Sequence, residues 1–250
     1  MPGKVYLIPA PIAEGTAPAV IPKGTLSVIA SLSYFLTEDV RTARRYLAGL
    51  KLFPSVELLK FETLNKDTSV AALDELFQPV FQGVSVGIIS ESGCPAIADP
   101  GAMAVAFAHN KGLEVVPLTG PSSILLALMA SGLNGQSFCF HGYLPVDKQA
   151  AVSKIKLLEK ESARNNCTQI FIETPYRNNR LFTLLLQSLS PNTRLCVAID
   201  LTGKAEKIRM QSIAAWKRER VTWPKLPAVF LFQACVFLFS ITPLLTLPPY

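Results

Sequence analysis

The stretch VSVGIISESGCPAIADPGAMAVAFAHNKGLEVVPLTGPSSILLALMA, residues 84–130, decides the fold of this chain. It opens with the apolar run Val86–Ile89, which is typical of a fully buried parallel strand. A turn-rich segment follows, and Asp99-Pro100 then begins a helix expected over residues 102–110. The pattern repeats with a strand over 113–118 and a second helix that ends at Gly132. This order of strands, loops and helices predicts a βαβα unit.

The loops that follow the two strands are the first candidate for a ligand site. In a βαβα unit such loops line a crevice at the carboxyl ends of the strands. The small residues Gly93, Cys94, Ala96 and Ala98 would let backbone groups approach a ligand closely. The same pattern also fits the ordinary loops of any α/β domain, and the residues alone leave both interpretations open.

A family resemblance appears at these residues. The segments GIISESGCPAIADPGAM (87–103) and EVVPLTGPSSILLALMASGL (114–133) resemble the signature of the tetrapyrrole methylase superfamily. The most similar branch methylates the ribose 2′-oxygen of a cytidine in small-subunit ribosomal RNA; its loop reads roughly VSDAGTPGISDPG. Five further stretches resemble that branch in the right order: LIPAPI (7–12), TEDVRTARRYL (37–47), FHGYLP (140–145), IFIETPYRNNRL (170–181) and LPAVFLF (226–232).

The resemblance implies an S-adenosylmethionine-dependent methyltransferase that acts on ribosomal RNA. It implies cofactor contacts from seven positions in the loops and turns: Pro11, Gly93, Cys94, Ile97, Tyr143, Pro227 and Ala228. Ser122 and Ser123 join this set because a helix N-terminus favours a carboxylate, although they equally fit a plain helix cap. The fold class is α/β, with two α/β domains and a cofactor cleft between them. The doubled pattern around residues 117–121 places the domains at 1–118 and 119–250.

The charged segment 37–45 carries the catalytic candidates Glu38, Asp39 and Arg41, by resemblance to an AEDTR motif. A charge run of this kind also fits a solvated helix face. A ribose hydroxyl is very weakly acidic, so a base assists methyl transfer, and Glu38, Asp39 and Glu173 are the candidates. Four arginines are candidates for phosphate contacts: Arg41, Arg44, Arg177 and Arg180.

Composition limits the classes that this chain can belong to. A net charge of +6 fits an anionic partner such as RNA, and from charge alone it fits a mildly basic protein without such a partner equally well. The 50% of hydrophobic residues can bury a sizeable core. Five scattered cysteines without a C-x-x-C motif indicate a reducing compartment, and we expect a cytoplasmic homodimer. Two histidines make a histidine-based metal cluster improbable, so we expect no metal. No signal peptide is expected, because the first strand begins almost at once.

Two departures from the branch leave other functions open. The first loop reads APIAEGTAP (10–18) where the branch reads TPIGNL, and LTGKAEK (201–207) replaces LTKxHEE. One alternative is a methyltransferase that acts on a tetrapyrrole or precorrin, and the other is a non-catalytic RNA-binding relative. The G-x-S-x-G match at 83–87 does not indicate a hydrolase, because Ser85 precedes its strand. The apolar tail 228–240 is too short for a membrane span, which needs about 20 residues.

Overall fold

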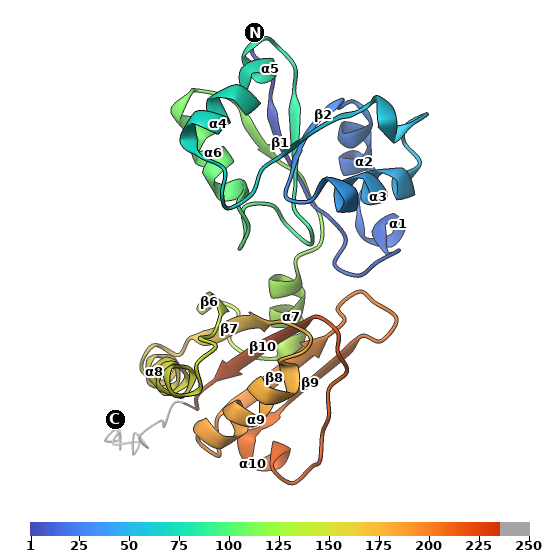
Figure 1. Ribbon diagram of the computed structural model, residues 1–250. Coiled ribbons are helices and arrows are strands. Elements are labelled where there is room, and N and C mark those ends of the chain that lie inside the picture. The colour runs from blue at the N-terminus through green and yellow to red at the C-terminus, as the bar shows by residue number, and fades with distance from the viewer. Residues whose placement is uncertain (236–250) are drawn as a thin grey trace, which may run out of the picture. The chain divides into compact units, whose positions relative to one another are not determined.

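The computed structural model describes residues 1–235 as two compact units, each built on a five-stranded sheet (Figure 1). The first unit comprises residues 1–126 and the short segment 200–207, and the second comprises 127–199 and 208–235. The division falls inside one helix, after Leu126. The domain boundary expected after Leu118 stays a prediction, and the expectations for the tail beyond Cys235 lie outside the described residues.

The first sheet is entirely parallel, in the order β3-β2-β4-β1-β5. Its strands are β1 (Val5–Ile8), β2 (Tyr34–Thr37), β3 (Lys60–Thr63), β4 (Val86–Ile89) and β5 (Val115–Pro117). Its helices are α1 (Ala17–Val20), α2 (Lys23–Ala30), α3 (Val40–Leu50), the 3₁₀ turn η1 (Val56–Leu58), α4 (Val70–Leu76), α5 (Gln78–Phe81) and α6 (Gly101–Asn110). The next helix, α7 (Ser123–Ser131), begins in the first unit and ends in the second. The βαβα unit expected over 84–130 is therefore present as β4-α6-β5-α7.

Two core layers cover the two faces of this sheet because successive strand residues point to opposite faces. Val86 and Ile88 of β4 pack with α4 and α6, whereas Ile89 packs with α2 and α3. Figure 1 shows α4 to α6 on one side of the strands and α2 and α3 on the other. Chain connections from β4 and β1 thus leave toward opposite faces, which makes the carboxyl ends of these adjacent strands a topological switch point.

The second sheet is mixed, in the order β6-β7-β10-β8-β9, with β10 antiparallel to both of its neighbours. Its strands are β6 (Phe138–Tyr143), β7 (Thr168–Glu173), β8 (Arg194–Ile199), β9 (Lys207–Ser212) and β10 (Ala228–Gln233). Its helices are α8 (Lys148–Asn165), α9 (Asn178–Ser188) and α10 (Ile213–Trp216). Inward-facing Phe171 and Phe230 stack at 6.0 Å between ring centroids and pack against α8 and α9.

Several expected element boundaries are wrong for local reasons. Apolar residues near helical spacing predict one helix over 65–81. The helix begins only at Val70, because Asn65 and Thr68 close a turn with side-chain hydrogen bonds and Ser69 caps α4. It then divides into α4 and α5, with Pro79 in the first turn of α5. The sequence HGYLP predicts a turn over 141–145, but this segment is partly strand, since β6 continues through Tyr143 with an irregularity after Phe140. The expected turn at 227–228 is also wrong, because Ala228 already pairs with β7 and β8.

Gly87 of β4 is required because the side chains of Ile8 and Phe35, from the two neighbouring strands, lie against it on the α2–α3 side of the sheet. A Cβ at this position would overlap the end of the Ile8 side chain and would approach the Phe35 ring at 2.9 Å. Both neighbours are fully buried, so neither can move into solvent. We expect Gly87→Ala to lower the free energy of unfolding by about 1–3 kcal/mol through overpacking.

Chemical denaturation measures this prediction, and Gly24→Ala is the matched control. Gly24 lies in α2 with open space around its Cβ direction, so the same added methyl group should be neutral or should stabilise by no more than about 1 kcal/mol. Equal effects of the two substitutions would contradict the packing described for Gly87.

Candidate functional site

Three loops meet at the carboxyl ends of β4, β1 and β5, and hydrogen bonds join them. The backbones of Ala10 and Gly93 pair in both directions, at 2.8 and 3.1 Å, which ties the loop after β1 to the loop after β4. The Cys94 thiol donates to the Pro121 carbonyl at 3.5 Å, which adds the loop after β5. The predicted residues Pro11, Gly93, Cys94 and Ser122 therefore lie in loops that contact one another.

A carboxylate shapes the loop after β4. One oxygen of Asp99 accepts hydrogen bonds from the backbone N–H groups of Ala96 and Gly101, both at 2.7 Å. The clamp closes a tight turn in which Ala96 and Ala98 adopt left-handed conformations, with φ of 67° and 61°. Such φ values are unfavourable for any residue with a Cβ. Ile97, between them, is left 53% exposed at the edge of the sheet.

The turn after β5 is also closely fitted. A Cβ on Gly120 would overlap the Pro9 ring, so only glycine lets this turn approach the loop after β1. The Thr25 hydroxyl donates to the Thr119 carbonyl at 2.8 Å and holds the turn from the α2 side. Ser122 precedes α7, and its hydroxyl accepts weakly from Leu125 N at 3.5 Å. Ser123 is the first residue of α7, so the helix N-terminus lies where the sequence places it.

The catalytic candidates follow β2 and differ in character. Asp39 caps α3 by accepting from Thr42 N at 2.6 Å, and this hydrogen bond lowers the pKa of its carboxyl. Partial burial and the nearby charges of Glu91 and Asp99 raise the pKa of the Glu38 carboxyl. Burial likewise raises the pKa of Asp99, against the effect of its two N–H donors. Glu38 and Asp99 line one small cavity of about 10 Å³, enough for a single water. Arg41 is exposed in the first turn of α3.

The remaining predicted residues belong to the second unit. Tyr143 ends β6 and is 56% exposed, Pro227 is exposed, and Ala228 is buried as the first residue of β10. The expectation that these residues join the first set around one cofactor stays a prediction.

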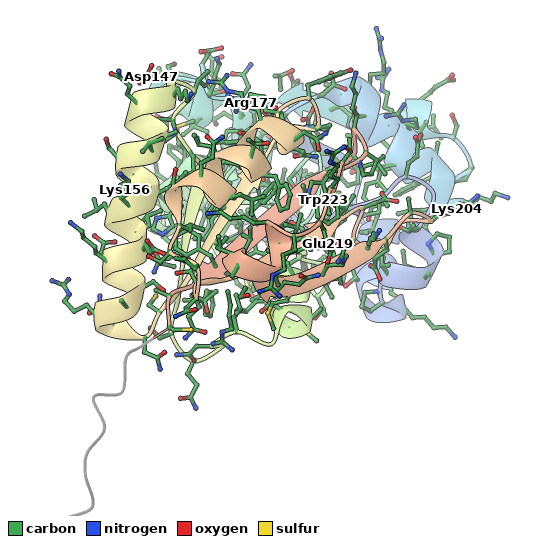
Figure 2. All side chains as sticks on the ribbon, turned by 90° about the horizontal axis from the view of Figure 1, so that it is seen from below. Asp147, Lys156, Arg177, Lys204, Glu219 and Trp223 are labelled. Atoms are coloured by element: carbon green, nitrogen blue, oxygen red, sulfur yellow. The ribbon has the colours of Figure 1, made fainter. Side chains whose placement is uncertain are left out.

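Glu173 and Arg177 in the second unit form an ion pair. The Arg177 guanidinium donates to the buried Glu173 carboxylate from Nη2 at 2.6 Å and from Nε at 2.9 Å. The backbone N–H of Thr174 donates to the same carboxylate oxygen at 2.7 Å. Arg180 donates to the Val146 carbonyl at 2.9 Å. Figure 2 shows Arg177 near the start of α9. These contacts already engage the Glu173 carboxylate and the Arg177 guanidinium, which makes both weaker candidates than their exposed counterparts on the first unit.

A cavity of about 420 Å³ within the first unit was missed by the sequence reasoning. Its floor is the carboxyl end of β4, and its walls come from the loop after β1, from α1 and from one face of α3. Pro11 is the one predicted site residue in its lining. The α3 face consists of Thr42, Arg45, Tyr46 and Gly49. Their helical spacing is visible in the sequence, but the charges of segment 37–45 alone do not indicate that these residues line a cavity.

Within residues 1–235 no cluster of three or more metal-ligating side chains is present. In the same range, no helix combines the length and the apolar character that a membrane span requires.

Relief of the strain at Ala96 gives a testable prediction. Ala96→Gly should raise the free energy of unfolding by about 0.5–1 kcal/mol, because left-handed backbone costs an L-residue about 1–2 kcal/mol and glycine loses more chain entropy on folding. Ala102→Gly on the exposed side of α6 is the control and should instead cost about 1 kcal/mol. Thermal or chemical unfolding measures both changes in the free energy of unfolding, which should be opposite in sign.

Glu38 and Asp39 should show opposite pH dependences. The pKa of Glu38 is raised in the folded protein, so its ionisation destabilises the fold as pH rises through the folded pKa. Glu38→Gln should therefore stabilise at pH 7, and this gain should vanish below the unfolded pKa of about 4.3. The pKa of Asp39 is lowered, so Asp39→Asn should destabilise at pH 7 and the loss should fade as pH falls through the folded pKa. Denaturant titrations at several pH values measure both changes in the free energy of unfolding. Changes of the same sign at pH 7 would contradict the opposite pKa shifts described for Glu38 and Asp39.

Comparisons with known proteins identify the relatives of this chain. No family model matches it. It is 32% identical over 219 residues to ribosomal RNA small subunit methyltransferase I of Vibrio cholerae, a match that covers 88% of this chain and 70% of that protein. The enzyme of the same name from Buchnera aphidicola subsp. Baizongia pistaciae is 30% identical, with 92% and 76% covered.

Solved structures show the same fold at low identity. A conserved hypothetical protein from Aeropyrum pernix aligns with a TM-score of 0.65 at 13% identity, over 94% of this chain and 86% of that one. A uroporphyrin-III C-methyltransferase from Thermus thermophilus, complexed with S-adenosylhomocysteine, aligns with a TM-score of 0.54 at 16% identity, over 92% and 97%. The expected two-sheet α/β fold of the tetrapyrrole methylases is confirmed. The similarity to the Vibrio and Buchnera enzymes shows that the chain belongs to the ribosomal RNA small subunit methyltransferase I family.

Proposed function

We propose that this protein transfers a methyl group from S-adenosylmethionine to RNA of the small ribosomal subunit, at the ribose 2′-oxygen of a cytidine. The observation that carries the proposal is the loop cluster held by the Ala10–Gly93 pair, in a member of this family. Its relatives are named for action on ribosomal RNA, which supports RNA over a tetrapyrrole as the acceptor. The likeness to the uroporphyrin enzyme concerns the fold alone.

The residues present fit the cofactor. The small side chains of the loop after β4 leave its backbone accessible, and exposed Ile97 offers an apolar surface beside it. Burial, together with the charges of Glu91 and Asp99, raises the pKa of Glu38, and a bound sulfonium cation would offset those charges. Pro11, Gly93, Cys94, Ile97, Ser122 and Ser123 would hold the cofactor from the first unit, with Tyr143, Pro227 and Ala228 proposed from the second.

The cofactor supplies an activated methyl group, and the protein must position the acceptor and take up its proton. Among the three candidate bases, Asp39 is committed to the cap of α3 and Glu173 to its ion pair with Arg177. Burial and nearby carboxylates raise the pKa of Glu38, which makes it a stronger base than an ordinary glutamate. We assign it that role, with Asp39 positioning α3 and Arg41 contacting phosphate.

A cytoplasmic location and a homodimer complete the proposal. All five cysteines are free, in agreement with a reducing compartment. Exposed apolar side chains on the second unit, Met129, Phe138 and Val146, are the kind of surface that association covers. The domains expected at 1–118 and 119–250 remain part of this proposal.

Methylation of isolated small ribosomal subunits tests the function directly. The wild-type protein, incubated with labelled S-adenosylmethionine and subunits from cells that lack the gene, should label one cytidine ribose, which mass spectrometry of RNA fragments locates. Cofactor binding without labelling of RNA would favour the non-catalytic relative, and labelling of a precorrin in place of RNA would overturn the acceptor.

The arginines of α3 should provide the salt-dependent part of RNA binding. Arg41 and Arg44 are exposed on α3, although Arg44 also lies 5.3 Å from the Phe61 ring centroid. Arg41→Ala with Arg44→Ala should weaken subunit binding and reduce the slope of log K against log salt by about 1.5, with cofactor affinity unchanged. Arg177 is unsuitable for this test, because its removal would leave the buried Glu173 carboxylate uncompensated.

A charge-matched control comes from α8. Lys156→Ala with Lys160→Ala removes the same charge from exposed positions on that helix, where Figure 2 labels Lys156. An equal loss of affinity in this control would mean that net charge, and not the α3 surface, governs RNA binding.

A further inference from the structure

The cavity of about 420 Å³ in the first unit overlaps the residues proposed for the cofactor at Pro11 alone. Of the cofactor residues proposed in that unit, Gly93, Cys94, Ile97, Ser122 and Ser123 do not line it. The two places are nevertheless adjacent. Ser90 lies in the cavity floor, and its hydroxyl donates to the Gly93 carbonyl at 3.3 Å. A ligand in this cavity would therefore lie next to the loop proposed to hold the methyl donor.

One face of α3 forms a wall of the cavity. Thr42, Arg45, Tyr46 and Gly49 are spaced i, i+3, i+4 and i+7, so they form a single stripe along the helix. Ala43, which also lines the cavity, is buried beside them. Gly49 is the smallest residue of this stripe. No heavy atom lies within 4 Å of the Cβ position that a side chain would take there.

The lining combines flat apolar groups with hydrogen-bonding groups. Tyr46 donates its hydroxyl to the Pro9 carbonyl at 2.9 Å, which fixes the aromatic ring as part of the wall. Pro11, Ile12 and Pro18 add apolar surface on the opposite side. The lining also offers an acceptor, the Glu91 carboxylate, and two donors, the Ser90 hydroxyl and the Arg45 guanidinium. The Arg45 side chain is largely exposed and lies 3.9 Å from the Glu14 carboxylate.

We infer that this cavity receives a single nucleoside of the RNA, the one that is methylated, and this inference rests on the proposed function. Its volume lies in the range of about 300–1,000 Å³ that small-ligand sites occupy. Proteins read RNA chiefly at unpaired nucleotides, whose bases stack on aromatic rings or arginine planes and are hydrogen-bonded at their edges. Tyr46 and Arg45 supply such surfaces, and Glu91 is an acceptor of the kind that pairs with an exocyclic amine of cytosine.

The surroundings of the cavity fit an RNA strand on either side of an inserted nucleoside. Arg41, Arg44 and Arg45 are all exposed on α3, the helix that forms the cavity wall. Phosphates flanking the nucleoside would meet this basic helix, while the base and ribose enter the cavity. Phosphate contacts position the strand, and the cavity then selects the nucleotide.

Filling the cavity from Gly49 tests the inference. Gly49→Phe places a ring in open space, and replacing a helical glycine should not lower the free energy of unfolding. We expect methylation of small subunits to fall at least about 100-fold at saturating cofactor, since small displacements of an acceptor are that costly. The affinity for S-adenosylmethionine should stay unchanged. Gly49→Ala, with a much smaller group, should retain most of the activity.

Gly24→Phe is the matched control. Gly24 also lies in an exposed helical position with open space around it, but it does not line the cavity. A second readout is binding of cytidine 5′-monophosphate, followed by calorimetry without any turnover. The nucleotide should bind the wild type and the Gly24→Phe variant, and its affinity should fall at least about 10-fold in Gly49→Phe if the ring takes the place of the nucleoside.

The outcomes separate this inference from the proposed function. Full activity or unchanged nucleotide affinity in Gly49→Phe would overturn the nucleoside site, and so would a selective loss of cofactor affinity in that variant. Nucleotide binding by the wild type that is weakened in Gly49→Phe, without any methylation of RNA, would support the site and refute the proposed function.

Discussion

The two hydrogen bonds between Ala10 and Gly93 organise the whole carboxyl edge of the first sheet. β1 and β4 are neighbours in space, although more than 70 residues separate them in sequence, and their following loops leave toward opposite faces. Without a direct link these loops would diverge. The backbone pair rejoins them two residues beyond the end of β1 and four residues beyond the end of β4. Gly93 can take part because its φ of 73° is free of strain in glycine. Ala10 lines the 420 Å³ cavity, and Gly93 lies in the loop that the Asp99 clamp shapes.

Charge at this edge is arranged in a way that a folded protein alone would not favour. Burial, together with the charges of Glu91 and Asp99, makes the ionised form of Glu38 less stable. Ala96 and Ala98 add backbone strain in the same loop. Strain and unfavourable charge that persist together are common at functional sites, where a ligand offsets them. A cationic cofactor would offset the unfavourable charge, and its contacts with the loop after β4 would offset the backbone strain.

Sequence reasoning recovered the elements whose signals are local and missed what depends on packing. β1 and β4 appear at the expected residues because each is a short apolar run bounded by turn formers. The helix expected over 65–81 failed because Asn65, Thr68 and Pro79 impose local hydrogen bonds and breaks that outweigh apolar spacing. Gly93, Cys94 and Ser122 could be predicted as neighbours, since parallel strands bring their carboxyl ends together. The cavity could not, because its far wall is the four-residue helix α1, for which the loop sequence APIAEGTAP carries no clear signal.

The departure of that first loop from its family pattern now has a physical setting. Residues 10–18 form one wall of the cavity, and α3, which closely follows the family motif, forms the other. A change confined to one wall alters the shape and polarity of the cavity that an acceptor meets. The Ala10–Gly93 pair, which holds the loop after β4, involves only backbone atoms and therefore tolerates a change of side chain. Variation in the loop after β1 away from Pro11 would therefore change which nucleoside is accepted without altering the loop after β4, to which we assign most of the cofactor contacts of this unit.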